Sequence, residues 1–265
     1  MKKLAVLIST LLIASVGLVG CGTSSSKNTE SNDLLSKIKS EGKLRIGTEG
    51  TYAPYTFHDK SGKLTGFDVE IAEEVSNRLG VKPEFVETKW DGLLAGLDAK
   101  RFDMIVNQVG IKPEREEKYD FSDPYIVSKA VLIVNSDDNT IKSFEDLKGK
   151  KSAQSLTSNL AQIAETNGAI LEPVDSFNQS IDLLVSKRVD ATVNDSLSYL
   201  DLKKQKPDID IKVVDEEGNA QPSGIMFNQG NKELVDAVNK AFADMKEDGT
   251  YLKISDKWFG TDVSK

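Results

Sequence analysis

The sequence predicts an α/β protein with two lobes, each a mainly parallel sheet with flanking helices, and a ligand cleft between the lobes. From residue 44 onward, short apolar strands alternate with amphipathic helices, which is the pattern of βαβ units. A similar series returns in the second half of the chain. Ligands of open parallel sheets bind beyond the carboxyl ends of the strands, so two such lobes facing each other would enclose a cleft.

The first series of elements covers residues 44–106. Asp68 is a suitable cap for a helix that ends before Gly80, and Asp91 is a suitable cap for a second helix. Each helix has an apolar stripe at helical spacing, formed by Ile71, Ala72, Val75 and Leu79 in the first and by Leu93, Leu94 and Leu97 in the second. The strands of this series are expected at residues 44–47, 83–86 and 102–106.

The second series begins where Ser158 opens a helix that Gly168 closes. A strand at 171–174, a helix bearing Ile181, Leu184 and Val185, and a strand at 191–193 follow. Residues 100–103 and 187–190 share the pattern Lys-Arg-x-Asp, each time between a helix and a strand. The strands after them carry the polar pairs Asn107–Gln108 and Asn194–Asp195, so we expect two related lobes.

The last 40 residues predict a strand at 224–227 and a helix over 234–245 that return to the first lobe. The chain should therefore cross between lobes twice, near residues 127–130 and 221–224. The expected division is lobe 1 at 34–128 and 223–265, and lobe 2 at 129–222.

Composition excludes several classes of protein. The 265 residues are 38% hydrophobic and 29% charged, which is near globular averages and indicates neither disorder nor a fibre. A formal net charge of −8 argues against nucleic acid as a partner, because phosphate contacts need a basic face. One Cys and one His make the usual zinc sites hard to build, and we expect neither a metal nor a cofactor.

The N-terminus has the form of an export signal over residues 1–20, with Lys2 and Lys3 before an apolar run. A retained membrane anchor is the alternative, although the run is short for one. The run ends in Leu18-Val19-Gly20-Cys21, which resembles a bacterial lipobox whose Cys21 is lipidated on its sulfur. Residues 21–33 then predict a flexible tether. Without Lys2 and Lys3 the chain has 32 basic and 42 acidic residues, a net charge of −10.

Several longer motifs resemble the polar amino-acid-binding proteins of ABC importers, family 3 type, over essentially the whole chain after residue 33. The opening Glu49-Gly50-Thr51-Tyr52-Ala53-Pro54-Tyr55-Thr56-Phe57 and the later Leu64-Thr65-Gly66-Phe67-Asp68-Val69-Glu70 are of this kind. The segments 89–93, 107–109, 118–125 and 257–263 narrow the likeness to the cystine-binding branch. The resemblance implies a type II periplasmic-binding-protein fold.

The resemblance also implies a site for a free amino acid, whose two opposite charges need an anion holder and a cation holder. Arg115 matches the arginine that grips the α-carboxylate, since a guanidinium donates two parallel hydrogen bonds. Gly110 matches a residue that donates to the same carboxylate, and Ser158 and Asn159 should add the N-terminal end of a helix. Asp195 matches the aspartate that binds the α-ammonium, helped by the backbone carbonyl of Gln108.

The ligand side chain is expected between Tyr52 and Trp90, which match the family's aromatic pair. Glu49 and Asn107 would meet a distal polar group, which in cystine is the second amino-acid half.

From the residues alone, each assignment has a plainer alternative. Arg115 would pair with Glu114, Glu116 or Glu117, and Ser158 would be an ordinary helix cap. Asp195 would cap a helix over 196–202, and Tyr52 and Trp90 would be core aromatics. His58, beside an acidic residue in a turn, is expected to be a surface residue. Neither a phosphate-binding loop nor a catalytic triad can be assembled.

The expected function is that of a lipid-anchored receptor outside the cytoplasm that captures an amino acid, most simply cystine. Closure of the cleft would signal to the membrane permease, and the receptor would act as a monomer without enzymatic activity. Three alternatives stay open: another amino acid such as cysteine, glutamine or a sulfur-containing analogue, a sensor that feeds a separate partner, and a dehydratase on the same fold.

Overall fold

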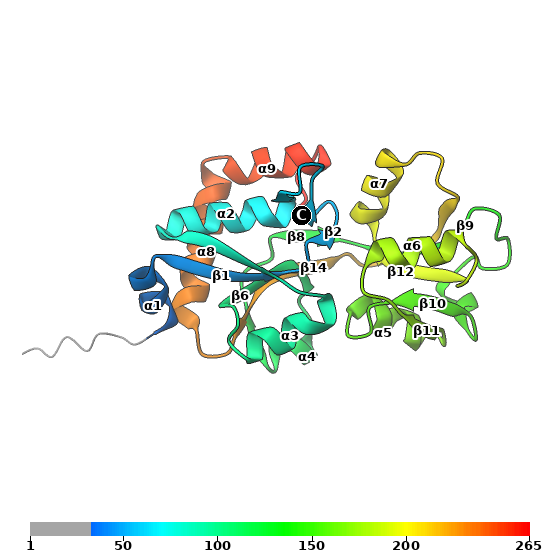
Figure 1. Cartoon of the computed structure of the whole chain (residues 1–265), viewed down its shortest axis with the longest axis horizontal. Coiled ribbons are helices and arrows are strands. Elements are labelled where there is room, and N and C mark those ends of the chain that lie inside the picture. Colours follow the sequence, from blue (N-terminus) through cyan, green and yellow to red (C-terminus); the bar gives the residue numbers. More distant parts are fainter. Residues whose placement is uncertain (1–32) are drawn as a thin grey trace, which may run out of the picture. The chain divides into compact units, whose positions relative to one another are not determined.

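The structure, a computed structural model, describes residues 33–265, which form two α/β lobes (Figure 1). The expected signal peptide at 1–20, Cys21 and nearly all of the expected tether at 21–33 lie outside the described residues. None of the helices between residues 33 and 265 has the length and apolar character needed to cross a bilayer.

The first lobe is built on a six-stranded sheet in the order β5-β1-β6-β14-β7, with β8 beside β14. The strands are β1 (Lys43–Thr48), β5 (Lys82–Glu87), β6 (Met104–Gly110), β7 (Tyr119–Phe121), β8 (Ile126–Ser128) and β14 (Gln221–Asn228). The pairs β1–β5 and β1–β6 are parallel, and β14 runs antiparallel to its neighbours. The helices of this lobe are α1 (Leu34–Glu41), α2 (Phe67–Leu79), α3 (Trp90–Asp98), α4 (Pro113–Glu116), α8 (Lys232–Glu247) and α9 (Thr250–Phe259).

The second lobe is built on a five-stranded sheet in the order β11-β10-β12-β9-β13, of which β11, β10 and β12 are parallel. Its strands are β9 (Ala130–Asn135), β10 (Lys151–Gln154), β11 (Ile170–Pro173), β12 (Ala191–Asp195) and β13 (Ile211–Glu216). Its helices are η1 (Phe144–Leu147), α5 (Asn159–Thr166), α6 (Phe177–Val185) and α7 (Ser196–Gln205). A small sheet of β2 (Thr51–Tyr52), β3 (Thr56–His58) and β4 (Leu64–Thr65) completes the first lobe.

The chain passes between the sheets twice. The first passage lies between Ser128 at the end of β8 and Ala130 at the start of β9, within the expected range. The second lies between Glu216 and Gln221, a few residues before the expected 221–224, because Gln221 already pairs with Ser128 in the first sheet. The two passages therefore lie side by side at this pair of strands.

Apolar side chains cover both faces of each sheet. In the first lobe, helices α2, α8 and α9 pack on one face and α3 on the other. In the second lobe, α6 and α7 cover one face and α5 the other (Figure 1). The helices that the sequence predicts are present because their apolar stripes are buried here, including Ile71, Ala72 and Val75 of α2.

Two predicted helix caps are wrong. The cap of α2 is Gly66, whose φ of 133° and whose contact with the Tyr55 carbonyl leave no room for a side chain. The cap of α3 is Lys89. Asp68 and Asp91 each lie two residues after the cap, within the first turn, and both carboxylates bind residues far away in the sequence, which are described below.

The repeated Lys-Arg-x-Asp pattern corresponds to a repeated structure. Lys100 and Lys187 both have left-handed backbones, with φ of 56° and 57°. Asp103 accepts a hydrogen bond from the backbone N–H of Arg45 at 2.9 Å, and Asp190 accepts one from Lys151 at 2.8 Å. In each lobe the aspartate thus ties the strand that it precedes to the neighbouring parallel strand, so the sequence repeat marks the equivalent corner of two related lobes.

Candidate functional site

A pocket with about 500 Å³ of space free of protein atoms is lined by residues from both sheets and their helices. Seven of the ten ligand-binding residues that the sequence predicts line it: Glu49, Tyr52, Trp90, Asn107, Gln108, Ser158 and Asn159. Gly110, Arg115 and Asp195 are not among the lining residues.

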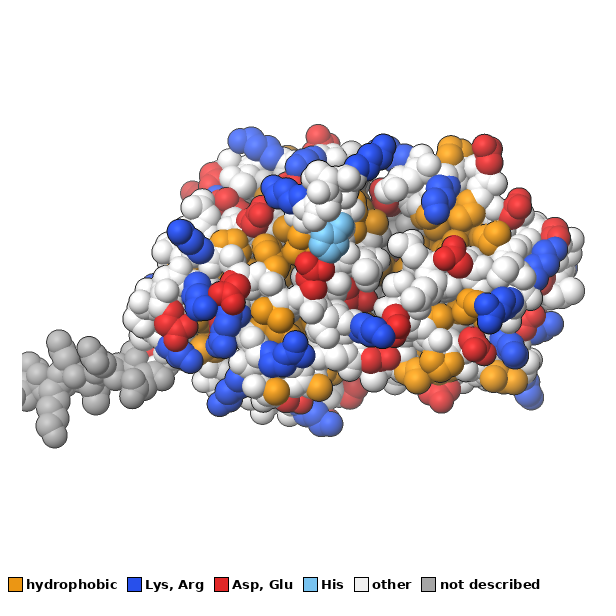
Figure 2. Space-filling view, viewed as in Figure 1, with side chains coloured by type: hydrophobic (Ala, Val, Ile, Leu, Met, Phe, Trp, Pro, Cys, Tyr) orange, Lys and Arg blue, Asp and Glu red, His pale blue; other side chains and the backbone are white. Residues whose placement is uncertain are grey.

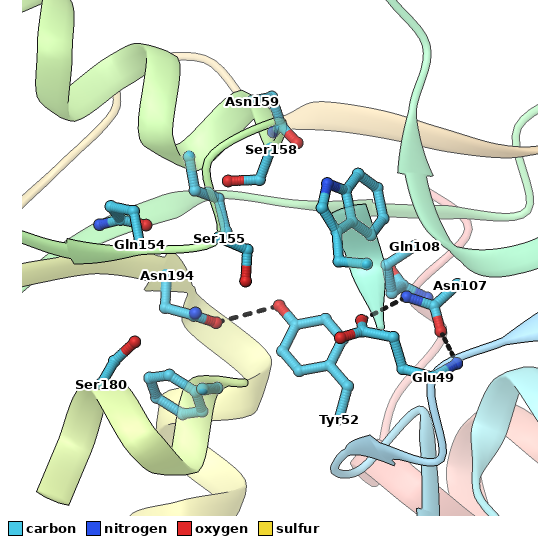
Figure 3. Close-up of a pocket in the computed structure, with 13 residues that line it drawn as sticks. Glu49, Tyr52, Asn107, Gln108, Gln154, Ser155, Ser158, Asn159, Ser180 and Asn194 are labelled. Carbon is cyan, nitrogen blue, oxygen red and sulfur yellow. Dashed lines mark hydrogen bonds between the residues drawn. The ribbon is translucent and has the colours of Figure 1, made fainter. Parts of the chain in front are cut away.

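Glu49 and Asn107 form a reciprocal pair on the first-lobe side of the pocket. The side-chain amide of Asn107 donates to Oε2 of Glu49 at 2.6 Å, and its Oδ1 accepts from the Glu49 backbone N–H at 2.8 Å (Figure 3). Burial raises the pKa of Glu49 to about 7. Glu49 forms no ion pair with any described residue, so its carboxyl needs either a proton or a cationic group that enters the pocket.

Arg115 is buried, and its guanidinium lacks a carboxylate partner among the described residues. Its Nη1 donates to the Gly110 carbonyl at 3.0 Å, and its guanidinium lies 5.6 Å from the centre of the Trp90 ring. The alternative that Arg115 pairs with neighbouring glutamates is wrong, since none of them forms an ion pair with it here. Burial lowers the pKa of Arg115, which shows that the charge is poorly compensated.

Residues of both lobes meet beside Gly110. A Cβ atom on Gly110 would lie 3.7 Å from Nη1 of Arg115 and 3.7 Å from Nδ2 of Asn159. Asn159 begins α5, whose cap Ser158 accepts from the Ala161 backbone N–H at 3.0 Å. Ser158 and Asn159 both line the pocket, so an amide and the positive end of a helix lie at one end of the site, and the guanidinium of Arg115 lies close to this amide without lining the pocket.

Asp195 is a helix cap, as the plainer reading of the sequence predicted. Its carboxylate accepts hydrogen bonds from the backbone N–H groups of Leu197 and Ser198 and from the hydroxyls of Tyr55 and Ser128. Burial raises its pKa despite these bonds. The preceding residue, Asn194, lines the pocket instead.

The sequence did not predict the hydrogen bonding of two aromatic side chains of the pocket, one of which has a partner in the second lobe and one of which has none. The hydroxyl of Tyr52 donates to Oδ1 of Asn194 at 3.0 Å, which joins the two lobes across the pocket (Figure 3). The Nε1 atom of Trp90 is buried and has no hydrogen-bond partner among the described residues. Phe177, at the start of α6, adds a third aromatic ring to the lining.

Gln108 is held in a strained conformation, with a φ of 54°. The Asp68 carboxylate accepts from its backbone N–H at 2.9 Å and from its side-chain amide at 2.7 Å. Burial raises the pKa of Asp68 to about 7. Asp68 therefore positions Gln108 from behind the pocket, a role that the sequence reading missed because it assigned Asp68 to the helix cap.

Six lining residues were not predicted: Gln154, Ser155, Leu160, Phe177, Ser180 and Asn194. A signal for Asn194 was present, since it follows Asp190 by four residues as Asn107 follows Asp103. Gln154 and Ser155 lie at the carboxyl end of β10, where ligands of parallel sheets bind.

His58 is exposed, as expected, and lies outside this pocket. Its Nδ1 is 3.1 Å from the Gly50 carbonyl, and its Nε2 is 3.3 Å from Glu87. Figure 2 shows it in pale blue, with acidic and basic side chains interspersed over the same face. Between residues 33 and 265, no group of three or more His, Cys, Asp or Glu side chains is arranged to hold a metal ion.

Two lobes that share one pocket, with a positive end and a separate acidic group, define a binding protein for small polar molecules. The chain belongs to the bacterial extracellular solute-binding proteins, family 3, whose sequence model matches residues 44–261. It is 49% identical to the L-cystine-binding protein TcyA of Bacillus subtilis (strain 168), over 100% of this chain and 99% of that protein. The family and this relative are binding proteins.

Two solved structures resemble the fold. An ancestral arginine-binding protein bound to arginine is 40% identical, with a TM-score of 0.78 over 82% of this chain and 98% of the other. The L-cystine solute receptor of Neisseria gonorrhoeae, in its unliganded open conformation, is 48% identical, with a TM-score of 0.58 over 87% of this chain and 98% of the other. The less similar sequence gives the better superposition, which is expected if the lobes of this chain are arranged as in a ligand-bound structure.

Proposed function

We propose that this protein is the substrate-binding subunit of an amino-acid ABC importer and that its ligand is cystine. The family and the relative TcyA support the class of function and this ligand. The observation that carries the proposal is that the half-buried carboxyl of Glu49, which lines the pocket, and the buried guanidinium of Arg115, close to it, each lack an ionic partner among the described residues. A molecule that carries both signs of charge compensates both.

In this proposal Arg115 binds the α-carboxylate, together with Gly110, Ser158 and Asn159. Nη1 of Arg115 and Nδ2 of Asn159 would each lie 3.7 Å from a Cβ atom on Gly110, which supports one shared anion position. Two parallel hydrogen bonds from the guanidinium would give this position its preference for a carboxylate.

Asp195 and the backbone carbonyl of Gln108 are proposed to bind the α-ammonium. The position of Asp195 at the carboxyl end of β12, next to the pocket-lining Asn194, supports this role. Because its carboxylate already accepts four hydrogen bonds, the ammonium would share or replace those of Tyr55 and Ser128.

Tyr52 and Trp90 would hold the ligand side chain, and Glu49 with Asn107 would meet its distal group. In cystine this group is the second amino-acid half, whose ammonium suits a carboxyl that otherwise keeps its proton to about pH 7. The same feature favours arginine as a second candidate ligand, as in the bound ancestral protein.

Closure of the lobes onto the ligand is proposed as the signal that the permease recognises. A ligand favours closure only through contacts that exist in the closed state, and the pocket lining drawn from both lobes supplies such contacts. The lobes are proposed to comprise residues 34–128 with 223–265, and residues 129–222.

The location outside the cytoplasm follows from the family, and attachment through a lipid on Cys21 after removal of residues 1–20 is part of the proposal. Residues 21–33 would act as the tether. The negative net charge supports a body that extends away from an anionic surface. A monomer is expected, without nucleic acid.

Thermal melting against a panel of amino acids tests the proposal. A ligand at 100 times its Kd stabilises the folded state by about 2.7 kcal/mol, and cystine should give the largest shift. Arg115→Ala should lose every shift, whereas Arg101→Ala, a change of an exposed arginine in the same lobe, should keep them. Trp90→Ala should alter the ranking of ligands. Normal binding by Arg115→Ala would overturn the assignment of the site.

A further inference from the structure

The residues on either side of Trp90 bind the second lobe outside the pocket. The Asp91 carboxylate accepts from the backbone N–H of Thr157 at 3.0 Å and from its hydroxyl at 2.7 Å. Lys89 donates to the Asp175 carboxylate at 2.6 Å. Both pairs are exposed at the rim, so neither contact needs a ligand atom.

The partners of these two residues occupy equivalent places in the second lobe. Thr157 directly precedes Ser158, the cap of α5, and Asp175 directly precedes Ser176, the cap of α6. The first residues of both helices line the pocket, with Ser158 and Asn159 from α5 and Phe177 from α6. Figure 3 shows Ser158 and Asn159 at the end of their helix, above the pocket.

We propose that Asp91 is a positioning residue that holds the N-terminal end of α5 against the pocket, and that this contact sets how long the closed state lasts. The inference rests on the proposed function and deepens it, because it separates residues that recognise the ligand from one that keeps the lobes together.

The two rim contacts should differ in strength. Lys89 and Asp175 form an ion pair whose side chains are 68% and 51% exposed, and such pairs contribute little in salt. Asp91 accepts two hydrogen bonds, one of them from the backbone N–H group of Thr157, the residue before the cap of α5. A third contact supports α5 as the element that is held, since Lys112 donates to Gln162 of this helix at 2.9 Å.

The test is the rate at which a bound amino acid leaves, measured by stopped flow with Trp fluorescence on the full chain, with L-cystine and L-arginine as separate probes. Asp91→Ala should speed dissociation about tenfold and leave association within about twofold. Thr157→Val, which removes only the hydroxyl, should have a smaller effect, and Asp91→Asn should recover part of the loss. Lys89→Ala and Asp244→Ala should stay within about twofold of the unchanged protein, because the first loses an exposed pair and the second a pair within α8.

If Asp91 contributed only to helix stability, the variants would behave differently. In that case Asp91→Ala would lower the melting temperature without changing dissociation, and its effect would add to that of Thr157→Val. The proposal instead requires non-additive effects on dissociation in the double variant. Dissociation of Asp91→Ala within twofold of the unchanged protein would overturn it.

Hydrogen–deuterium exchange separates this inference from the proposed function. The peptide that contains the Thr157 amide should exchange faster in Asp91→Ala than in Asp244→Ala, whichever amino acid the protein binds. Equal exchange overturns the positioning role. If the protein binds none of the amino acids but the two variants still differ in exchange, the proposed function is wrong and the positioning role of Asp91 stands.

Discussion

The hydroxyl of Tyr55, in the first lobe, donates to Oδ1 of Asp195, in the second, at 2.5 Å. Both groups are buried, and the same carboxylate caps α7. The Asp195 carboxylate therefore caps helix α7, accepts a hydrogen bond from Ser128 at the end of β8, and accepts another from Tyr55 in the opposite lobe. This arrangement makes the region around Asp195 a structural centre of the molecule whatever ligand it binds.

Removal of the Tyr55 hydroxyl should destabilise the protein without removing the ring. Tyr55→Phe leaves a buried carboxylate with one donor fewer and should lower the free energy of unfolding by about 1–3 kcal/mol. Urea unfolding measures the change. Tyr119→Phe is the matched control, because Tyr119 donates to the exposed Asp98 within one lobe, and it should lose less. A larger loss in Tyr119→Phe would contradict the importance of the Tyr55 contact.

Stability should fall as the pH rises from about 4 to about 7. Asp68 keeps its proton to about pH 7 in the folded state, whereas an unfolded aspartate loses it near pH 4. Between these two pH values the folded state binds more protons than the unfolded state. A carboxyl group with a raised pKa, such as that of Asp68, therefore lowers the free energy of unfolding by up to about 1.4 kcal/mol for each pH unit of increase. Asp68→Asn should flatten this slope in unfolding curves collected from pH 4 to 8. An unchanged slope would show that Asp68 is ionised in the folded protein.

Ligand affinity should depend on pH through Glu49. A cationic group near Glu49 favours its ionised form, and burial holds the pKa of that carboxyl at about 7. Titration calorimetry with L-arginine or L-cystine should therefore find binding about tenfold weaker at pH 5.5 than at pH 7.5. Glu49→Gln should bind more weakly at pH 7.5 and show nearly equal affinities at the two values. An equal pH dependence in this variant would place the titrating group elsewhere.

An added side chain should leave the stability of the protein unchanged at Gly110 and lower it at Gly47. A Cβ atom at Gly110 meets nothing closer than 3.7 Å, so Gly110→Ser should fold normally and offer a hydroxyl beside Arg115. A Cβ atom at Gly47 would lie 2.5 Å from the ring of Phe102, which is buried. Gly47→Ala should therefore cost about 1–3 kcal/mol in the free energy of unfolding. Comparable stabilities of the two variants would contradict this packing.

The two repeated aspartates should differ in their contribution to stability. Asp103 is buried and binds both the backbone N–H and the guanidinium of Arg45, while Asp190 is exposed and binds the backbone N–H of Lys151. Loss of a buried partner leaves Arg45 without its carboxylate, so Asp103→Ala should cost about 2 kcal/mol more than Asp190→Ala. Chemical denaturation of both variants tests this, and equal losses would refute it.

Much of the site was predictable because its residues follow local rules. Ser158 caps a helix, and Asn107 and Asn194 follow the repeated aspartates. Because the carboxyl ends of parallel strands lie at one edge of a sheet, the position of these residues along the chain implies their position in the pocket. Asp68 and Asp91 show where such rules fail. Each could cap a helix, but each carboxylate binds donors from a distant segment that only the folded chain brings near.

The sequence by itself determined the two lobes, their repeated corner and the helices, because periodicity and short motifs act over a few residues, and its resemblance to the family gave seven of the thirteen pocket-lining residues. Tertiary structure alone decided which charges stay without a partner and which carboxylates hold the lobes together. Those outcomes depend on burial and on donors separated by tens to more than a hundred residues, as in the Tyr55–Asp195 and Asp91–Thr157 contacts.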